Sequence, residues 1–395
     1  MTQPAISAWI LPAEQMPVSA PSAGHLRLAR IESWLSGLGY PPATPGPRPR
    51  ARRPLAPGRR GTWRALAGAL GRLAGGPLLA GLALRRRPAV VVANTALNAP
   101  AVALIKLLLG RRVLVLVDLM GLRSLEVDQT ARAAPARALY RPLWRGLERL
   151  LLRRADVVLT VNERHVELIR LLHGRDDAHA LRDAAEAGLE HTQPADRSAL
   201  GVPAGAVAVC FVGSLVSSRL DGIMDAWDEL AHDPGGDGTP RACLVVVGDG
   251  PDLRDCRRRA AARGWPAGSA IFLGGLPRER ALAVARACDI AVSDCWSEAG
   301  LPFKLYEYMA LGMPIVTEGK PQIGELLTAD ETALFFHDPL ELARHVRRLA
   351  GDVDLRARLG GGARRAFLAE HTLEARRREF EELLGPVLAS VGPER

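Results

Sequence analysis

Lysine, paired cysteines and long uncharged apolar runs are all scarce in this 395-residue sequence. Only three of its 52 cationic side chains are lysines (Lys106, Lys304 and Lys320), and the others are arginines. The five cysteines form no Cys-x-x-Cys pair, which excludes the usual spacings of zinc and thioredoxin-like redox sites. We therefore expect a reduced, cytoplasmic protein without structural zinc.

Targeting and membrane-spanning signals are also missing. The first residues lack the charged and apolar regions of a signal peptide. Residues 65–84 are long enough to cross a bilayer, but they contain Arg72, Pro77 and five glycines, and arginines flank both ends. We expect this segment to pack in a core or to lie on a membrane surface.

Positive charge is abundant: the formal net charge is +9, and the stretch from Arg48 to Arg87 contains eleven arginines and no acidic residue. Such a balance favours an anionic partner. We expect this stretch to dock on an anionic membrane surface, on the inner face of the cell membrane, and expect no nucleic-acid partner. The alternative is a solvated, arginine-rich face that packs against the first sheet.

Short apolar runs alternate with helical stretches of ten or more residues along most of the chain. Examples are "RPAVVVAN" followed by "ALNAPAVALIKLLLG", and "ADVVLTV" followed by "NERHVELIRLLHG". This alternation is typical of α/β proteins with doubly wound parallel sheets. A polar stretch over residues 183–205 interrupts it, so we expect two Rossmann-like domains of similar size facing across a cleft, over residues 1–195 and 196–370.

The stretch "SEAGLPFKLYEYMALGMPIV", residues 297–316, follows the apolar run "DIAVSD". Pro302 suits the first turn of a helix, whose free backbone N–H groups attract phosphate. Lys304 adds a cation in the same turn, and Glu307 lies three residues further on the same helix face. A carboxylate there can accept hydrogen bonds from two ribose hydroxyls. The pattern indicates a nucleoside diphosphate site, although spacing alone also fits an ordinary surface ion pair.

Several motifs in this half resemble the GT-B glycosyltransferases, in particular the retaining family four. They are "EYMALGMPIVTEGKPQIGELL", "FVGSLVSSRLDGIMDAW" and "LVVVGDGPDLRD". The resemblance covers residues 207–385 well and is mainly architectural over residues 1–182. It implies a GT-B fold in which a terminal helix, residues 371–395, crosses back to the N-terminal domain.

The resemblance also implies roles for individual residues. Glu307 matches the glutamate that holds the donor ribose, while Arg219 and Lys304 match cations that bind the diphosphate. Glu298 corresponds to the glutamate that contacts the transferred sugar. It lies one residue before the family position, which Ala299 occupies in this sequence. Asp118 either faces the reacting sugar or acceptor or caps a loop. Further donor-binding candidates are Gly24, Gly213, Ser214, Gly275, Gly300 and Leu301.

The implied activity is metal-independent, cofactor-free transfer of a hexosyl group from a nucleoside diphosphate sugar, with retention of configuration. The acceptor expected is a lipid-linked or saccharide molecule. Ser214 stands where the family usually has arginine, and a histidine often found after the third strand is missing. These departures keep two alternatives open: a catalytically weak binding subunit with the same fold, and a sugar-nucleotide epimerase.

Overall fold

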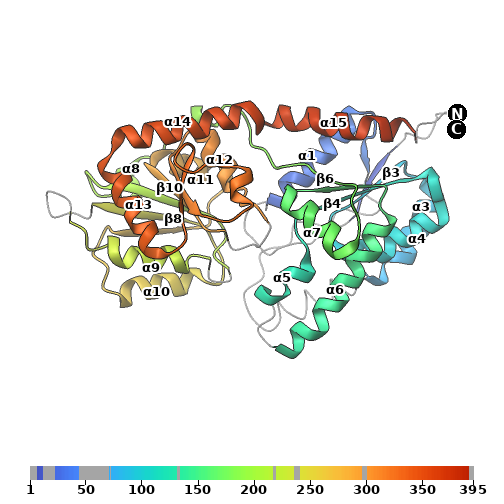
Figure 1. Cartoon of the computed structure of the whole chain (residues 1–395), viewed down its shortest axis with the longest axis horizontal. Helices are drawn as coiled ribbons and strands as arrows, with labels where there is room; N and C mark the ends of the chain where they lie inside the picture. Colours follow the sequence, from blue (N-terminus) through green and yellow to red (C-terminus); the bar gives the residue numbers. More distant parts are fainter. Residues whose placement is uncertain are drawn as a thin grey trace. The chain divides into compact units, whose positions relative to one another are not determined.

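The computed structural model describes residues 7–11, 23–43, 71, 73–130, 134–216, 219–234, 241–295 and 300–390. Contacts divide the chain into two compact units (Figure 1). The first contains the N-terminal part up to Arg182 together with Arg376–Arg395, and the second contains Asp183–Ala375. The second unit therefore begins within the polar stretch that interrupts the sequence pattern.

The first unit contains a six-stranded parallel sheet in the order β2-β1-β3-β4-β5-β6. Its strands are β1 (Ala8–Ile10), β2 (Pro42–Ala43), β3 (Val90–Ala93), β4 (Leu114–Leu119), β5 (Val157–Thr160) and β6 (Ala178–Ala180). Every residue of β3, β4 and β5 is buried. Such uninterrupted burial is expected of a parallel sheet whose two faces are both covered.

Seven helices of the described ranges belong wholly or mostly to this unit. They are α1 (Ala23–Gly37), α3 (Gly76–Arg86), α4 (Ala99–Leu109), α5 (Arg123–Thr130), α6 (Ala134–Arg154), α7 (Glu163–His173) and α15 (Leu373–Ala389). Both ends of α7 are capped: Asn162 Oδ1 accepts a hydrogen bond from His165 N, and Gly174 takes φ +67°. The terminal helix packs on this unit as the resemblance implied, with the Phe380 ring 5.2 Å from the Trp34 ring.

The second unit contains a second six-stranded parallel sheet, in the order β12-β11-β10-β7-β8-β9. Its strands are β7 (Val207–Val212), β8 (Ala242–Val247), β9 (Ala270–Gly274), β10 (Ile290–Ser293), β11 (Ile315–Glu318) and β12 (Ala333–Phe336). Its helices are α8 (Arg197–Leu200), α9 (Asp221–Leu230), α10 (Leu253–Ala262), α11 (Arg278–Ala287), α12 (Lys304–Leu311), α13 (Pro339–Gly351) and α14 (Val353–Glu370). The expected α/β architecture of two doubly wound sheets is confirmed.

The strand order of the second sheet reverses between β7 and β10, because successive strands are added first on one side of β7 and then on the other. Ligands of open α/β sheets bind beyond the carboxyl ends of the strands at such a reversal. The helix that follows β10 is α12, so this helix begins where the topology favours a ligand. Within the described ranges, no helix has the length and apolar character needed to cross a bilayer.

A glycine contact holds the C-terminal end of α12 against α14. A Cβ built on Gly360 would lie 2.2 Å from the carbonyl oxygen of Gly312, the residue that caps α12. The neighbouring Gly361 is different, since its Cβ would meet only the flexible end of Arg365, at 3.4 Å. Glycine is therefore required at the first of these positions and not at the second.

We predict opposite effects of alanine at these two adjacent positions. Gly360→Ala should destabilise the protein by about 1–3 kcal/mol, because the helices must move apart. Gly361→Ala should be neutral or should stabilise by up to ~1 kcal/mol, because alanine is the better helix former. Urea denaturation of both variants measures the difference, and equal midpoints would contradict the close contact.

Candidate functional site

The carboxyl ends of β7 and β10 bring together most of the predicted donor-binding residues of the second unit. Gly213 follows β7, Asp294 follows β10 and Lys304 begins α12. The ammonium of Lys304 lies 2.8 Å from Oδ1 of Asp294 and 3.7 Å from the centre of the Phe211 ring. A Cβ on Gly213 would come within 3.3 Å of the same ammonium. The lysine therefore ends at the strand reversal.

Burial lowers the pKa of Lys304, and the Asp294 carboxylate opposes that change. The positive charge of nearby Arg219 lowers the pKa further. Arg219 itself donates a hydrogen bond of 3.1 Å to Oγ of Ser214. Two cations that the sequence assigned to a diphosphate thus lie close together at one edge of the sheet.

Glycine also shapes the loops around these cations. A Cβ at Gly248, which follows β8, would lie 1.8 Å from the carbonyl oxygen of Gly213. The loops that leave β7 and β8 therefore touch through their backbones. This contact fixes the backbone of Gly213 beside Lys304.

Glu307, the predicted ribose carboxylate, lies on α12 and is 8% exposed. Nε of Arg278 donates to its Oε1 over 2.8 Å, and Nη2 of Arg278 donates to Oε2 of Glu186 over 2.6 Å. Burial acts against the charge of Arg278, but the two carboxylates raise its pKa. The guanidinium thereby holds Glu307 in one orientation at the edge of the site.

Asp294 and Arg278 are not among the site residues that the sequence predicts. The position of Asp294 directly after a buried strand could have indicated it. Arg278 is the first residue of α11, where a cation is unfavourable for the helix dipole. The carboxylates of Glu186 and Glu307 pair with Arg278 and offset this unfavourable interaction.

The remaining candidates of this unit lie on adjoining loops. Gly275 follows β9, and the carbonyl oxygen of Gly300 accepts a hydrogen bond of 3.6 Å from the Cys295 thiol. Leu301 packs against the apolar cluster that contains α12. Glu298 lies outside the described residues. Across the part of the chain that the structure describes, no three His, Cys, Asp or Glu side chains are grouped as metal ligands.

Asp118 and Gly24 belong to the first unit. Asp118, on β4, is 2% exposed, and both of its carboxylate oxygens accept hydrogen bonds of 2.9 and 3.0 Å from Nε of Arg27. Gly24 and Arg27 lie one turn apart on α1. A buried carboxylate held in this way fixes α1 on the sheet, which favours a positioning role for Asp118 over direct contact with a substrate.

His165 lies in the first turn of α7, close to Arg27. Burial, and then the positive charge of Arg27, lower the pKa of His165 to about 4. The ring is therefore neutral at pH 7. No histidine follows the third strand in the sequence, and His165 lies in α7, the helix after β5.

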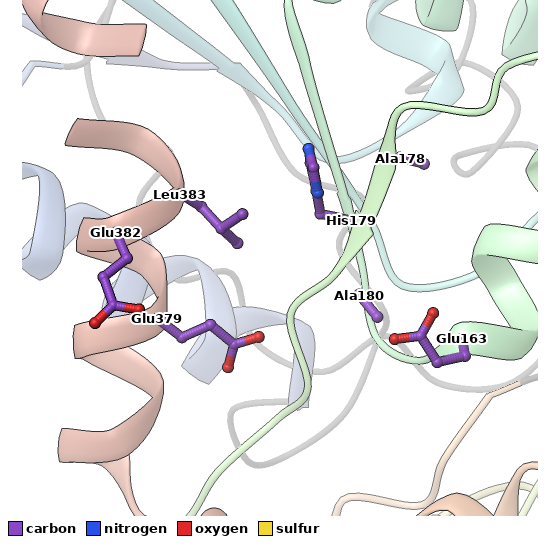
Figure 2. A pocket seen from close by; sticks show the side chains of 7 residues that line it. All are labelled: Glu163, Ala178, His179, Ala180, Glu379, Glu382 and Leu383. Atoms are coloured by element: carbon purple, nitrogen blue, oxygen red, sulfur yellow. The ribbon is translucent and has the colours of Figure 1, made fainter. Parts of the chain in front are cut away.

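A pocket of about 390 Å³ opens between β6 and α15 in the same unit. Figure 2 shows Glu163 at one side of the opening and Glu379 with Glu382 on the helix opposite, while His179 projects from the strand. Arg376, on the same helix, forms an ion pair with Glu379. None of the residues predicted to bind the donor lines this pocket.

Comparison with known families finds glycosyltransferase domains in both units. A model described as "Glycosyl transferase 4-like domain" matches residues 23–182, and one described as "Glycosyl transferase-like" matches residues 239–382.

Among curated proteins, 2-deoxystreptamine N-acetyl-D-glucosaminyltransferase of Streptomyces fradiae is 31% identical over 179 residues, which is 42% of this chain. An uncharacterized glycosyltransferase of Methanocaldococcus jannaschii is 27% identical over 168 residues. The chain spans about two fifths of the length of these relatives, with 40% and 41% of them matched.

Solved structures extend the likeness to the whole fold. Sucrose-phosphate synthase of Thermosynechococcus elongatus superposes with a TM-score of 0.74 at 16% identity, covering 97% of this chain and 99% of that one. The Anabaena protein HepE in complex with UDP-glucose gives a TM-score of 0.67 at 16% identity, covering 96% and 99%. At such identities the likeness shows the GT-B fold.

The environment of His165 predicts loss of stability in mild acid. Because its pKa is about 4 in the folded protein and 6.5 in a model peptide, the unfolded chain takes up the proton first as the pH falls. Between pH 7.5 and pH 5 this one group should lower the free energy of unfolding by about 2 kcal/mol. Urea denaturation as a function of pH measures the change.

His165→Gln should lose this part of the pH dependence, whereas His179→Gln, at an exposed position of β6 in the same unit, should retain it. If the pH profiles of His165→Gln and the wild type coincide, His165 is not buried as the structure places it.

Proposed function

Because the chain is built from the two domains of a GT-B-type glycosyltransferase, we propose that it transfers a hexosyl group from a nucleoside diphosphate sugar to an acceptor. The observation that carries the proposal is the group formed by Lys304, Arg219 and Glu307 at the strand reversal of the second sheet. The UDP-glucose complex of the Anabaena protein supports a uridine nucleotide as the donor. The aminocyclitol transferase of Streptomyces fradiae supports an N-acetylglucosaminyl group as one candidate for the sugar.

Each of the three side chains has a part in the proposed reaction. Glu307 accepts hydrogen bonds from the ribose hydroxyls in the orientation that Arg278 imposes. Lys304 and Arg219 bind the diphosphate and stabilise the negative charge that it acquires as it leaves, which is the usual means of lowering such a barrier. We propose that these cations make a catalytic metal ion unnecessary.

The stereochemical proposal is retention, by attack of the acceptor on the same face that the diphosphate leaves. The leaving phosphate then accepts the proton of the attacking hydroxyl. Asp118 supports the acceptor-side domain indirectly in this scheme, because Arg27 occupies both of its oxygens.

We further propose that the first unit docks on an anionic membrane that carries a lipid-linked acceptor. Residues 48–70 and 72 of the arginine-rich stretch lie outside the described residues. The described remainder includes α3, which packs beside α4. These neighbouring helices carry no acidic residue, and they expose Leu78, Leu84, Leu107 and Leu108 to solvent.

Arginines adjoin these leucines at the end of each helix. Arg85, Arg86 and Arg87 are exposed at the end of α3, and Arg111 and Arg112 are exposed just after α4. Exposed apolar side chains next to clustered cations suit the interface of an anionic bilayer, where apolar burial and charge attraction add together.

Substitutions at the donor site should separate binding from turnover. Glu307→Ala should weaken UDP-sugar binding by roughly 10- to 100-fold, the loss expected for hydrogen bonds to a charged group. Lys304→Ala should mainly lower turnover, on the order of 10²-fold. Glu186→Ala, which removes the other partner of Arg278, should have the smaller effect on binding. Isothermal titration and nucleotide release assays in excess EDTA measure these quantities.

Several outcomes would contradict the proposal. Wild-type turnover in Lys304→Ala would exclude the role of that lysine. Loss of activity in EDTA, restored by Mg²⁺ or Mn²⁺, would exclude the metal-independent scheme. Nucleotide binding without any turnover would favour a binding subunit, and conversion of the donor without an acceptor would favour an epimerase.

Membrane docking predicts salt-sensitive co-sedimentation with vesicles that contain phosphatidylglycerol. Replacing Arg111 and Arg112 together by serine should weaken binding roughly 30-fold, at about 1 kcal/mol for each charge near the surface. The matched double variant of Arg254 and Arg258, on α10 of the second unit, should bind as the wild type does. Protein that stays in the supernatant at low salt would refute docking and favour a soluble acceptor.

A further inference from the structure

Asp294 occupies the strand reversal, directly after β10, and is 9% exposed. One of its carboxylate oxygens, Oδ1, accepts the hydrogen bond of 2.8 Å from Lys304. The other, Oδ2, is buried and has no hydrogen-bond partner among the described residues. A buried acceptor in this condition costs free energy comparable to a lost hydrogen bond, and such groups are uncommon in native proteins.

The donors next to Asp294 in the chain are engaged elsewhere. The hydroxyl of Ser293 donates to the backbone oxygen of Asp294 over 2.9 Å, and the backbone N–H of Cys295 donates to Glu318 over 3.0 Å. The ammonium of Lys304 is directed to Oδ1. A bound ligand can therefore supply the hydrogen-bond donor that Oδ2 of Asp294 lacks.

The chemistry of the oxygen selects which part of a ligand it meets. A carboxylate oxygen accepts hydrogen bonds and repels phosphate oxygens, so its partner must be an O–H or N–H group. In the proposed donor, the ribose hydroxyls are bound by Glu307, and the diphosphate is bound by Lys304 and Arg219. The hydroxyls that remain are those of the transferred sugar, which is bonded directly to the phosphate.

We propose that Oδ2 of Asp294 accepts a hydrogen bond from a hydroxyl of the sugar being transferred. Asp294 then distinguishes a nucleoside diphosphate sugar from the nucleoside diphosphate that remains after transfer. This inference rests on the proposed function. The same contact gives Asp294 a part in sugar specificity, since a sugar without that hydroxyl would leave the buried oxygen unpaired.

Asp294→Asn tests the proposal, because asparagine keeps the size of the side chain and removes its charge. Isothermal titration of UDP, UDP-glucose and UDP-N-acetylglucosamine gives the factor by which the sugar improves affinity over UDP alone. In the variant, this ratio of UDP-sugar affinity to UDP affinity should fall roughly 10- to 100-fold, as expected for the loss of a hydrogen bond to a charged group. Its affinity for UDP should stay the same or increase, because a negative charge beside the diphosphate is gone.

Asp289→Asn is the matched control. Asp289 lies just before the same strand, β10, at its opposite end, where it pairs with Arg197 at 3.0 Å and accepts a hydrogen bond from Ala208 N. This variant loses the ion pair between Asp289 and Arg197, which does not face the site. The factor by which the sugar improves its affinity over UDP should therefore equal that of the wild type. Thermal unfolding of both variants shows whether each remains folded at the titration temperature.

UDP-sugars that each lack one hydroxyl identify the group that Asp294 contacts. The deoxy sugar without that hydroxyl should bind the wild type more weakly than the parent sugar does, whereas Asp294→Asn should bind the two almost equally, as expected for coupled partners. If Asp294→Asn changes the affinities for UDP and for UDP-sugars by one common factor, the aspartate only balances Lys304 and the inference is wrong. If the wild type binds no nucleotide, the proposed function fails first and the inference fails with it.

Discussion

The proposed donor site depends on the burial of a single short helix, α12. Every residue from Leu305 to Leu311 is buried, so the helix cannot shift without disturbing apolar contacts on all sides. The hydroxyl of Tyr308 accepts a hydrogen bond of 2.9 Å from the backbone N–H of Val212, at the end of β7. This bond ties α12 to the strand that ends beside Lys304. The positions of Lys304 and Glu307 follow from this packing, because both lie at the start of the same helix.

The sequence predicted the two sheets because the physical signal was strong and local. Apolar runs such as those of β4 and β8 are buried on both faces, and the helices between them have clear lengths and ends. It also predicted that Lys304 and Glu307 begin a helix after a buried strand. Patterns of this kind depend on neighbours in the chain, which a sequence shows directly.

Pairings between distant residues were not predictable in the same way. Asp294 meets Lys304 because β10 ends beside α12, and Arg278 meets Glu307 because α11 begins near it. Asp118 was read as a residue facing a substrate or capping a loop, whereas the structure pairs it with Arg27, 91 positions away. No spacing rule connects such partners. A charge that is expensive to bury does require a partner, so each buried ionisable residue raises the question of its counter-ion.

The order of charged groups from the end of β10 to the first turns of α12 bears on which ligand the site suits. Oδ2 of Asp294 offers an acceptor at one end, the Lys304 ammonium lies next to it, and the Glu307 carboxylate follows one helical turn further. A ligand that satisfies all three must present a hydrogen-bond donor, then negative charge, then another donor. A sugar hydroxyl, a diphosphate and a ribose occur in that order in a nucleoside diphosphate sugar. A free phosphate or a nucleoside would satisfy only part of the series, so the arrangement of acceptor, cation and acceptor favours the complete donor over its fragments.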